Sequence, residues 1–350
     1  MKARYKKHIL NFKRPSGTSR GILTQKETWF LILEENGKLG IGECGLLRGL
    51  SMDDVDGYED KLQWTCDNIS LGVQALYGEL KAFPSIQFGI EQAFISLRSN
   101  DAFELFTSSF TGGKSTIPIN GLIWMGDAGF MYEQIQQKLE EGFSCIKTKI
   151  GAIDFNKEIE LLESIRKRYS KDDIELRVDA NGAFEPKQAL EKLQALSHYD
   201  LHSIEQPIKQ GQYSQMKRLC SESPLPIALD EELIGVFELK EKKRLLQTIQ
   251  PHYLILKPSL IGGVKGSEEW IALANEYDID WWVTSALESN IGLNAIAQWT
   301  FTLNNPMPQG LGTGSLFTNN FDCPLAVKGG QLGYGNDKYW ETNLIESLCM

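Results

Sequence analysis

The rhythm of hydrophobic and polar positions changes near residue 116 of the chain. Before this point, three runs rich in aromatic and β-branched residues predict strands that follow one another as an antiparallel meander. Two segments with helical spacing of apolar residues come next. The predicted strands cover residues 5–12, 27–34 and 39–43, and the predicted helices cover residues 53–68 and 84–99. Residues 1–116 are therefore expected to form a separate α+β domain.

A polar segment rich in Gly, Ser and Pro separates the first two predicted strands at residues 13–21. Its composition is typical of a mobile loop, and it carries the cationic side chains of Lys13, Arg14 and Arg20. The segment is expected to be either a plain surface hairpin loop or a lid over a substrate.

From residue 117 onward, strand and helix patterns alternate. Each repeat has about 30 residues, the length of one strand and its crossover helix. The predicted strands cover residues 117–123, 145–149, 175–179, 201–205, 227–230, 253–257 and 280–284, with a last short strand near residues 309–311. This alternation predicts a parallel sheet, either closed as a barrel or open and doubly wound. The chain lacks a Gly-x-Gly-x-x-Gly signature and a Walker-type lysine loop, which counts against an open nucleotide-binding sheet.

Five successive predicted strands each end in a charged residue. These residues are Lys149, Asp179, Glu205, Asp230 and Lys257. The carboxyl ends of barrel strands meet at one mouth, so a barrel would bring all five charges together. We therefore predict a TIM-type barrel over residues 117–315, capped by the α+β domain. The tail at residues 316–350 has an irregular pattern and is expected to return to that first domain.

The three consecutive acids, Asp179, Glu205 and Asp230, indicate a metal site. Neighbouring strands lie about 4.8 Å apart, so unpaired carboxylates there would repel and raise one another's pKa. A divalent cation would offset this repulsion. A set of oxygen ligands without Cys or His favours Mg²⁺, with Mn²⁺ as a substitute, over Zn²⁺. Taken singly, each acid could instead cap a helix or pair with a surface lysine.

Lysines flank the acids on both sides. Lys149 and Lys257 are expected to face each other across the mouth, and nearby cations would lower a lysine pKa enough for it to act as a general base. Lys147 shares a strand face with Lys149 and is expected to lower the lysine pKa further. Lys147 could also bind an anion or fill the barrel, and Lys257 could form a salt bridge. A Schiff-base lysine is a less favoured interpretation. Carboxylate-bound metal with lysines alongside suits abstraction of a proton next to a substrate carboxylate.

Composition and charge narrow the class of partner. The net charge of −10 argues against a nucleic-acid binder, although a local basic pocket for an anion remains compatible with it. The chain has no apolar run of about 18 residues, so no membrane span is expected. The start of the chain does not have the pattern of a signal peptide. The six cysteines lie far apart without a Cys-x-x-Cys pair, which predicts a reduced, cytoplasmic protein without a disulfide framework. We expect a small anionic carboxylate as the substrate, and a monomer and a homo-oligomer are both compatible with the sequence.

Five motifs together resemble the muconate-lactonising-enzyme subgroup of the enolase superfamily. They are Lys147-Thr148-Lys149 and residues 177–184, 203–207, 229–231 and 257–263. The resemblance covers nearly the whole chain and implies a capping α+β domain, a modified (β/α)7β barrel and a returning tail. It also implies that Asp179, Glu205 and Asp230 hold Mg²⁺, and that Asn181 and Arg177 support these ligands. Glu231 is a competing ligand next to Asp230. We favour Asp230, because Asp230 ends the apolar run.

Within the subgroup, residues 119–126, 285–292 and 312–317 resemble o-succinylbenzoate synthases. The resemblance implies dehydration of 2-succinyl-6-hydroxy-2,4-cyclohexadiene-1-carboxylate to o-succinylbenzoate, a step of menaquinone synthesis. Lys149 would take the α-proton and return it to the departing hydroxyl, while Lys257 stays cationic.

Substrate contacts are expected from Lys147 and Ser285, and residues 14–21 are further candidates for the succinyl end. The alternative is an N-acylamino acid racemase or dipeptide epimerase of the same subgroup, in which both Lys149 and Lys257 act as bases.

Overall fold

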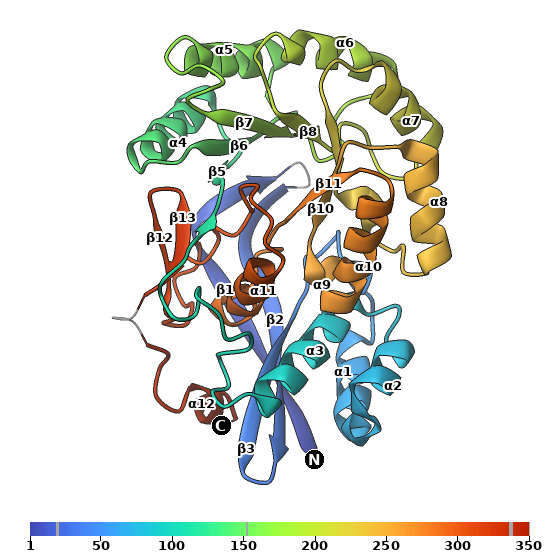
Figure 1. The fold of residues 1–350 in the computed structure, drawn as a ribbon, viewed down its shortest axis with the longest axis vertical. Coiled ribbons are helices and arrows are strands. Elements are labelled where there is room, and N and C mark those ends of the chain that lie inside the picture. The colour runs from blue at the N-terminus through green and yellow to red at the C-terminus, as the bar shows by residue number, and fades with distance from the viewer. Residues whose placement is uncertain (19–20, 152, 336–338, 350) are drawn as a thin grey trace.

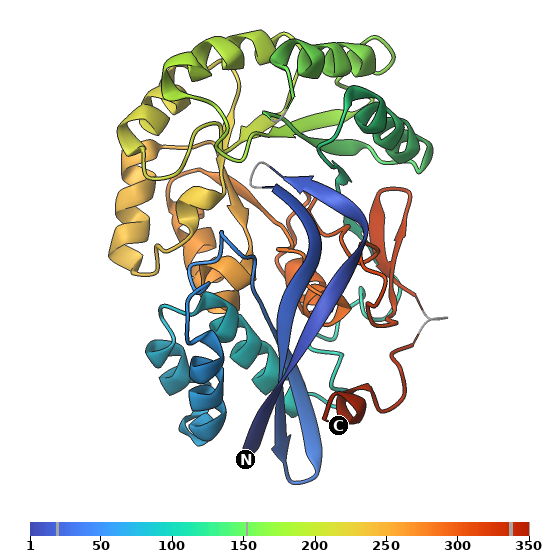
Figure 2. The same cartoon turned by 180° about the vertical axis from the view of Figure 1, so that it is seen from behind.

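The computed structural model describes the whole chain except residues 19, 20, 152, 336–338 and 350. Its elements form a cap and a barrel, with helices arranged as an arc around the barrel strands (Figure 1). In the view from behind, the first two strands of the chain run together across the face of the molecule towards the barrel strands (Figure 2).

The first three strands pair in the predicted antiparallel order, β1-β2-β3. They are β1 (Lys2–Thr18), β2 (Gly21–Glu35) and β3 (Lys38–Gly45). The predicted mobile loop at residues 13–21 is wrong for its first part, because β1 continues to Thr18 and pairs with the start of β2. The pairing register shifts between Asn11 and Ser16. This irregularity accommodates Pro15, which has no N–H to donate. Residues 19 and 20 of that segment lie outside the described residues.

The cap helices are α1 (Tyr58–Asp67), α2 (Gly72–Glu79) and α3 (Pro84–Arg98), with a 3-10 turn at Ile69–Leu71. Helix α3 begins at Pro84, as its first-turn preference predicts. The helix predicted from residue 53 begins later, at Tyr58, after Gly57 with φ 85°. Asp53 instead accepts hydrogen bonds from the Ser85 N–H and hydroxyl. A Cβ at Gly42 of β3 would lie 1.9 Å from a backbone oxygen of α3, so glycine permits this close packing.

The barrel strands form a parallel sheet in sequence order from β5 to β11. They are β5 (Gly121–Ile123), β6 (Cys145–Lys149), β7 (Glu175–Asp179), β8 (Ser203–Glu205), β9 (Ile227–Leu229), β10 (Tyr253–Leu256) and β11 (Asp280–Val283). The predicted strand at 117–123 is divided, because β4 (Ile117–Pro118) pairs with the tail instead. The predicted last strand is reduced to isolated bridges of Gln309 with Ile119 and of Gly310 with Thr284. These bridges join β11 to the start of the barrel, so the predicted barrel class is confirmed.

Helices follow the strands and cover the outer side of the sheet (Figure 1). They are α4 (Ala128–Glu140), α5 (Phe155–Arg166), α6 (Pro186–Ser197), α7 (Tyr213–Glu222), α8 (Leu239–Ile249), α9 (Pro258–Ile261), α10 (Gly263–Glu276) and α11 (Asn290–Thr302), with a 3-10 turn at Glu231–Leu233. Buried aliphatic side chains of strands and helices form one core cluster between them. Among the described helices, none has both the length and the hydropathy needed to cross a bilayer.

The tail contains regular elements, so the expectation of an irregular segment is wrong. Strands β12 (Leu325–Lys328) and β13 (Gln331–Tyr334) form a hairpin that pairs with β4, and α12 (Leu344–Cys349) ends the chain. Leu344 and Ile345 of α12 pack in one cluster with Phe30 and Ile32 of β2. The tail therefore contacts the N-terminal sheet.

Two carboxylates of the cap bind the N-termini of barrel helices. Glu43 of β3 accepts hydrogen bonds from the Ser289 N–H, the Ser289 hydroxyl and the Gly292 N–H at the start of α11. Glu91 of α3 accepts from the N–H groups of Val264 and Lys265 at the start of α10. The first N–H groups of a helix have no partner inside it and favour negative charge. These contacts therefore fix the segments that follow β10 and β11.

Glu91 predicts a pH-dependent contribution to stability. Burial raises the pKa of Glu91 to about 7, although the two backbone hydrogen bonds lower it. The folded chain then holds a proton that the unfolded chain releases near the ordinary value of 4.5. Between these values the folded state binds more protons, so the contribution of Glu91 to the free energy of unfolding falls as pH rises, by at most about 3 kcal/mol.

Urea unfolding of the wild type and Glu91→Gln across pH 4.5 to 7.5 tests this, because the other groups cancel in the difference. The wild type should lose stability relative to the variant as pH rises. Parallel profiles would show that Glu91 does not hold the proton.

Candidate active site

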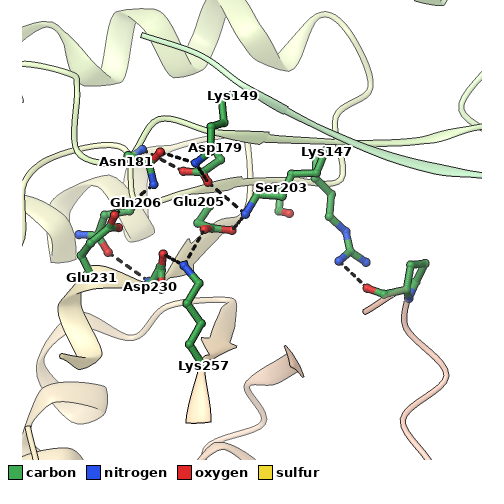
Figure 3. A network of polar contacts seen from close by, with 12 residues as sticks. Lys147, Lys149, Asp179, Asn181, Ser203, Glu205, Gln206, Asp230, Glu231 and Lys257 are labelled. Carbon is green, nitrogen blue, oxygen red and sulfur yellow. Dashed lines mark hydrogen bonds and ion pairs between the residues drawn. The ribbon is translucent and has the colours of Figure 1, made fainter. Parts of the chain in front are cut away.

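The structure brings the five charged residues from the strand ends together at one mouth of the barrel (Figure 3). Lys149, Asp179 and Glu205 are paired across β6, β7 and β8 in direct register. Asp230 directly follows β9, and Lys257 directly follows β10. The three acids are each no more than 2% exposed, so their charges must be offset by neighbouring groups.

Lysine ammonium groups lie between the carboxylates. Lys147 Nζ is 2.5 Å from Glu205 Oε2 and 3.1 Å from Asp179 Oδ2. Lys149 Nζ is 3.0 Å from the same Asp179 oxygen. Lys257 donates to Asp230 and lies 4.0 Å from Glu205 Oε1. The crowding of acids is therefore offset here by lysines, and repulsion alone does not require a metal.

These contacts change the ionisation of the cluster. Burial raises the pKa of Glu205 to about 8, and the adjacent Asp179 raises it while Lys147 lowers it. Burial also acts to raise the pKa of Asp179, but Lys147 and Lys149 outweigh it and hold that pKa well below its usual range. Burial would lower the pKa of Lys147, yet Asp179 and Glu205 raise it. The expectation that Lys147 has a lowered pKa is wrong. The attraction of two adjacent carboxylates outweighs the effect of burial on this pKa.

The donor chemistry of the cluster fits a hard divalent cation. Glu205 Oε1 is buried, and no described residue forms a hydrogen bond with it. Three carboxylates supply the oxygen ligands that Mg²⁺ prefers. In the described residues the acids do not converge on one point as a ready metal cage, because the ammonium groups of Lys147 and Lys257 stand between them. A bound cation would replace these contacts and release the lysines toward the cavity.

Asn181 lies beside the lysine predicted to act as the base. Lys149 Nζ is 2.6 Å from Asn181 Oδ1. The Asn181 amide donates to Glu231 at 3.1 Å, and its backbone N–H donates to Asp179. Asn181 has φ 44°, a conformation that Asn tolerates better than most residues. Asn181 thus orients Lys149 and Asp179, and Glu231 lies behind Asn181.

Arg177 lies deeper in the barrel and away from the acids. Its guanidinium donates to Glu175 at 2.6 Å and to the Pro308 carbonyl at 2.9 Å, and it stacks 4.0 Å from the Trp282 ring centre. None of the hydrogen bonds formed by described residues joins Arg177 to Asp179, Glu205 or Asp230. These contacts hold Arg177 against Trp282 and Pro308, and its support of the metal ligands stays a prediction.

Ser285 lies at the cavity wall, but its hydroxyl is fully engaged. It donates to Glu288 at 2.6 Å and accepts from Thr313 at 2.9 Å and from the Leu287 N–H at 3.0 Å. A serine hydroxyl has one proton and two lone pairs, so no hydrogen-bonding capacity is left for a substrate. Glu288 also accepts from Ser259, two residues after Lys257. Ser285 and Glu288 therefore link the segment after β11 to Ser259 in this arrangement. Donation from Ser285 to a substrate would require breaking its bond to Glu288.

A cavity of about 190 Å³ opens beside the acidic cluster. Lys147, Lys149 and Lys257 line it, together with Arg48 of the cap. The wall opposite contains residues from the barrel seam: Asn120, Leu122, Trp124, Thr284, Gly310 and Thr313. Sequence reasoning did not select Asn120, Thr284 or Gly310. Alternation along the first barrel strand could have indicated Asn120, because it shares a face with Leu122 and Trp124.

Comparison with known proteins gives a match to a family model and several relatives. The family model described as Enolase C-terminal domain-like matches residues 131–334. The o-succinylbenzoate synthase of Desulfotalea psychrophila is 47% identical in an alignment that covers 95% of this chain and 99% of that protein. The L-Ala-D/L-Glu epimerase of Bacillus subtilis is 22% identical and covers 88% of this chain and 84% of the epimerase.

Among solved structures, an enzyme from Desulfotalea psychrophila is again more similar to this chain than a distant relative is. The crystal structure of MenC from Desulfotalea psychrophila has a TM-score of 0.85 at 44% identity, covering 95% of this chain and 99% of that chain. Muconate lactonizing enzyme from Pseudomonas fluorescens has a TM-score of 0.81 at 21% identity, covering 97% and 96%. At that lower identity, the likeness is one of fold alone.

The lysine–carboxylate contacts predict a large loss of stability in Lys147→Met. The side chain of Lys147 is 7% exposed, and its removal leaves Asp179 and Glu205 buried with less compensation. We expect a loss of about 3–5 kcal/mol in the free energy of unfolding without added metal, measured by urea denaturation.

Lys243→Met is the matched control, because the Lys243–Glu276 pair is about half exposed. It should leave stability nearly unchanged. Equal small effects from both variants would contradict a charge balance that depends on Lys147.

Proposed function

This chain belongs to the enolase superfamily, and we propose that it is an o-succinylbenzoate synthase, a carbon–oxygen lyase that dehydrates 2-succinyl-6-hydroxy-2,4-cyclohexadiene-1-carboxylate. The order of groups around the mouth, which is lysine, three acids, lysine, supports abstraction of a proton next to a carboxylate. Similarity over almost the full length to an o-succinylbenzoate synthase favours this reaction over that of the distant epimerases.

Lys149 is the proposed base. It stands at the end of β6, where Asp179 and Asn181 hold its ammonium nitrogen at 3.0 and 2.6 Å. As the free amine it takes the proton next to the substrate carboxylate. It then returns that proton to the hydroxyl group, which leaves as water. Loss of water makes the ring aromatic, so the reaction does not need an unusually strong acid.

Lys257 is the proposed fixed cation on the other side. Burial would lower the pKa of Lys257, but Asp230 and Glu205 raise it. As an ammonium group it would offset the negative charge that develops on the substrate carboxylate.

The acids Asp179, Glu205 and Asp230 are the proposed ligands of Mg²⁺, with Mn²⁺ as a substitute. When bound, the metal would supply positive charge beside the substrate carboxylate. Lys147 has two acidic partners at this place, and once these acids hold the metal it would bind the carboxylate of the substrate.

We further propose the domain division expected from the sequence. Residues 1–116 with the tail 316–350 form the cap, and residues 117–315 form the catalytic barrel. Contacts of Glu43 and Glu91 with barrel helices, and of α12 with β2, support this arrangement. The cap then excludes water from a small carboxylate substrate, and we expect a cytoplasmic enzyme in menaquinone synthesis.

Turnover tests the function directly. Purified protein with Mg²⁺ should convert the cyclohexadiene substrate to the aromatic product, followed by the change in ultraviolet absorbance. Lys149→Ala should lower kcat by at least about 10²–10⁴-fold, the typical contribution of a general base. Absence of turnover, together with α-proton exchange on N-succinylamino acids or dipeptides, would overturn the proposal in favour of the racemase or epimerase.

Metal binding has a readout independent of activity. Adding Mg²⁺ at about 100 times its Kd should stabilise the folded wild type by about 2.7 kcal/mol, seen as a rise in Tm. Asp230→Asn should lose most of this rise. Glu231→Gln is the matched control, because it removes the adjacent buried carboxylate and should keep the rise. The opposite pattern would assign the ligand to Glu231.

A further inference from the structure

The wall of the cavity opposite the acids has neutral polar groups that lack protein partners. Asn120 is 5% exposed, and no described residue forms a hydrogen bond with its buried Oδ1 atom. Thr284 Oγ1 is likewise buried without a partner among the described residues. Both residues line the cavity. A buried polar group without a partner is costly, so two at one ligand cavity indicate that a ligand satisfies them.

Gly310 leaves room between these two groups. Asn120 N–H donates to the Gln309 carbonyl, and Gly310 is bridged to Thr284. A Cβ at Gly310 would lie 2.5 Å from Thr284 Oγ1. Any side chain here would therefore displace the Thr284 hydroxyl.

The position of this wall selects one end of the substrate. The 309–310 segment lies opposite β8, which carries Glu205, with β5 to β7 between them on one side and β9 to β11 on the other. A substrate with its reacting carboxylate at the acids extends its succinyl chain toward Asn120 and Thr284. We propose that these two residues bind the ketone oxygen of the succinyl chain.

The chemistry of the wall favours a ketone over a second carboxylate. Asn120 and Thr284 are neutral, and a buried carboxylate would need a cation to offset its charge. Lys147, which also lines the cavity, is the proposed partner of the reacting carboxylate and is therefore not free for a second one. A hydroxyl can donate to a ketone, and a half-turn of the Asn120 amide exchanges its oxygen for an NH₂ donor.

This inference rests on the proposed function and is tested by binding of the product. o-Succinylbenzoate keeps the ketone, whereas 2-(3-carboxypropyl)benzoate has a CH₂ group in its place. With Mg²⁺ present, Asn120→Leu and Thr284→Val should each weaken binding of o-succinylbenzoate by about 3- to 10-fold. They should change the Kd of the CH₂ analogue by less than about twofold. Calorimetry measures both ligands.

Thr300→Val is the matched control. Thr300 also has a buried hydroxyl without a described partner, but it lies on α11 and does not line the cavity. It should leave both affinities unchanged. The Tm of Asn120→Leu and Thr284→Val should equal or exceed that of the wild type, because the removed atoms lose no protein hydrogen bond.

Three outcomes contradict the inference. Equal weakening of both ligands, with or without a lower Tm, shows a structural role. Unchanged binding of o-succinylbenzoate shows that the ketone lies elsewhere. If the wild type forms product and one of these results is found, only the ketone site fails. If the wild type neither forms product nor binds o-succinylbenzoate, the proposed function fails and the ketone site fails with it.

Discussion

The structure depends on how three buried carboxyl groups share one mouth of the barrel with three lysines. Asp179, Glu205 and Asp230 are almost without solvent exposure, and burial of ionised groups costs several kcal/mol for each ion unless it is offset. The offset comes from lysines on the flanking strands, at distances that only a well-aligned parallel sheet provides. The pairing register of the strands therefore also decides which charged side chains lie next to one another. A slip of one residue would turn each of these side chains away from the cavity.

The predicted strand ends were accurate because each ends an apolar run, and that pattern is local. The first part of the loop expected at residues 13–21 was predicted wrongly because Gly, Ser and Pro indicate a turn, whereas a register shift in a long hairpin accommodates them. Ser285 and Arg177 show the limit for single residues: Thr313 and Pro308, which are distant in the sequence, contact them only through tertiary packing. The lysine pKa was predicted from neighbouring cations alone, and the closer acids reverse its direction for Lys147.

The cap contributes to the site without lining most of it. Glu43 and Glu91 hold the first turns of α11 and α10, and these helices follow the loops that carry Ser285 and Lys257. Carboxylates at helix N-termini satisfy donors that would otherwise need water. The cap thus replaces water at the start of two barrel helices. The position of the cap and the geometry of the segments after β10 and β11 are consequently coupled.

The acidic side of the site and the wall at residues 309 and 310 depend on contacts of different sequence separation. The acids and lysines come from β6 to β10, which are neighbours in sequence as well as in the sheet, so short-range strand pairing assembles them. Asn120 meets Gln309 only when opposite ends of the barrel sequence join. Contacts between distant segments form slowly, because closing the long loop costs conformational entropy first. During synthesis from the ribosome, the acidic half can therefore form before the opposite wall exists.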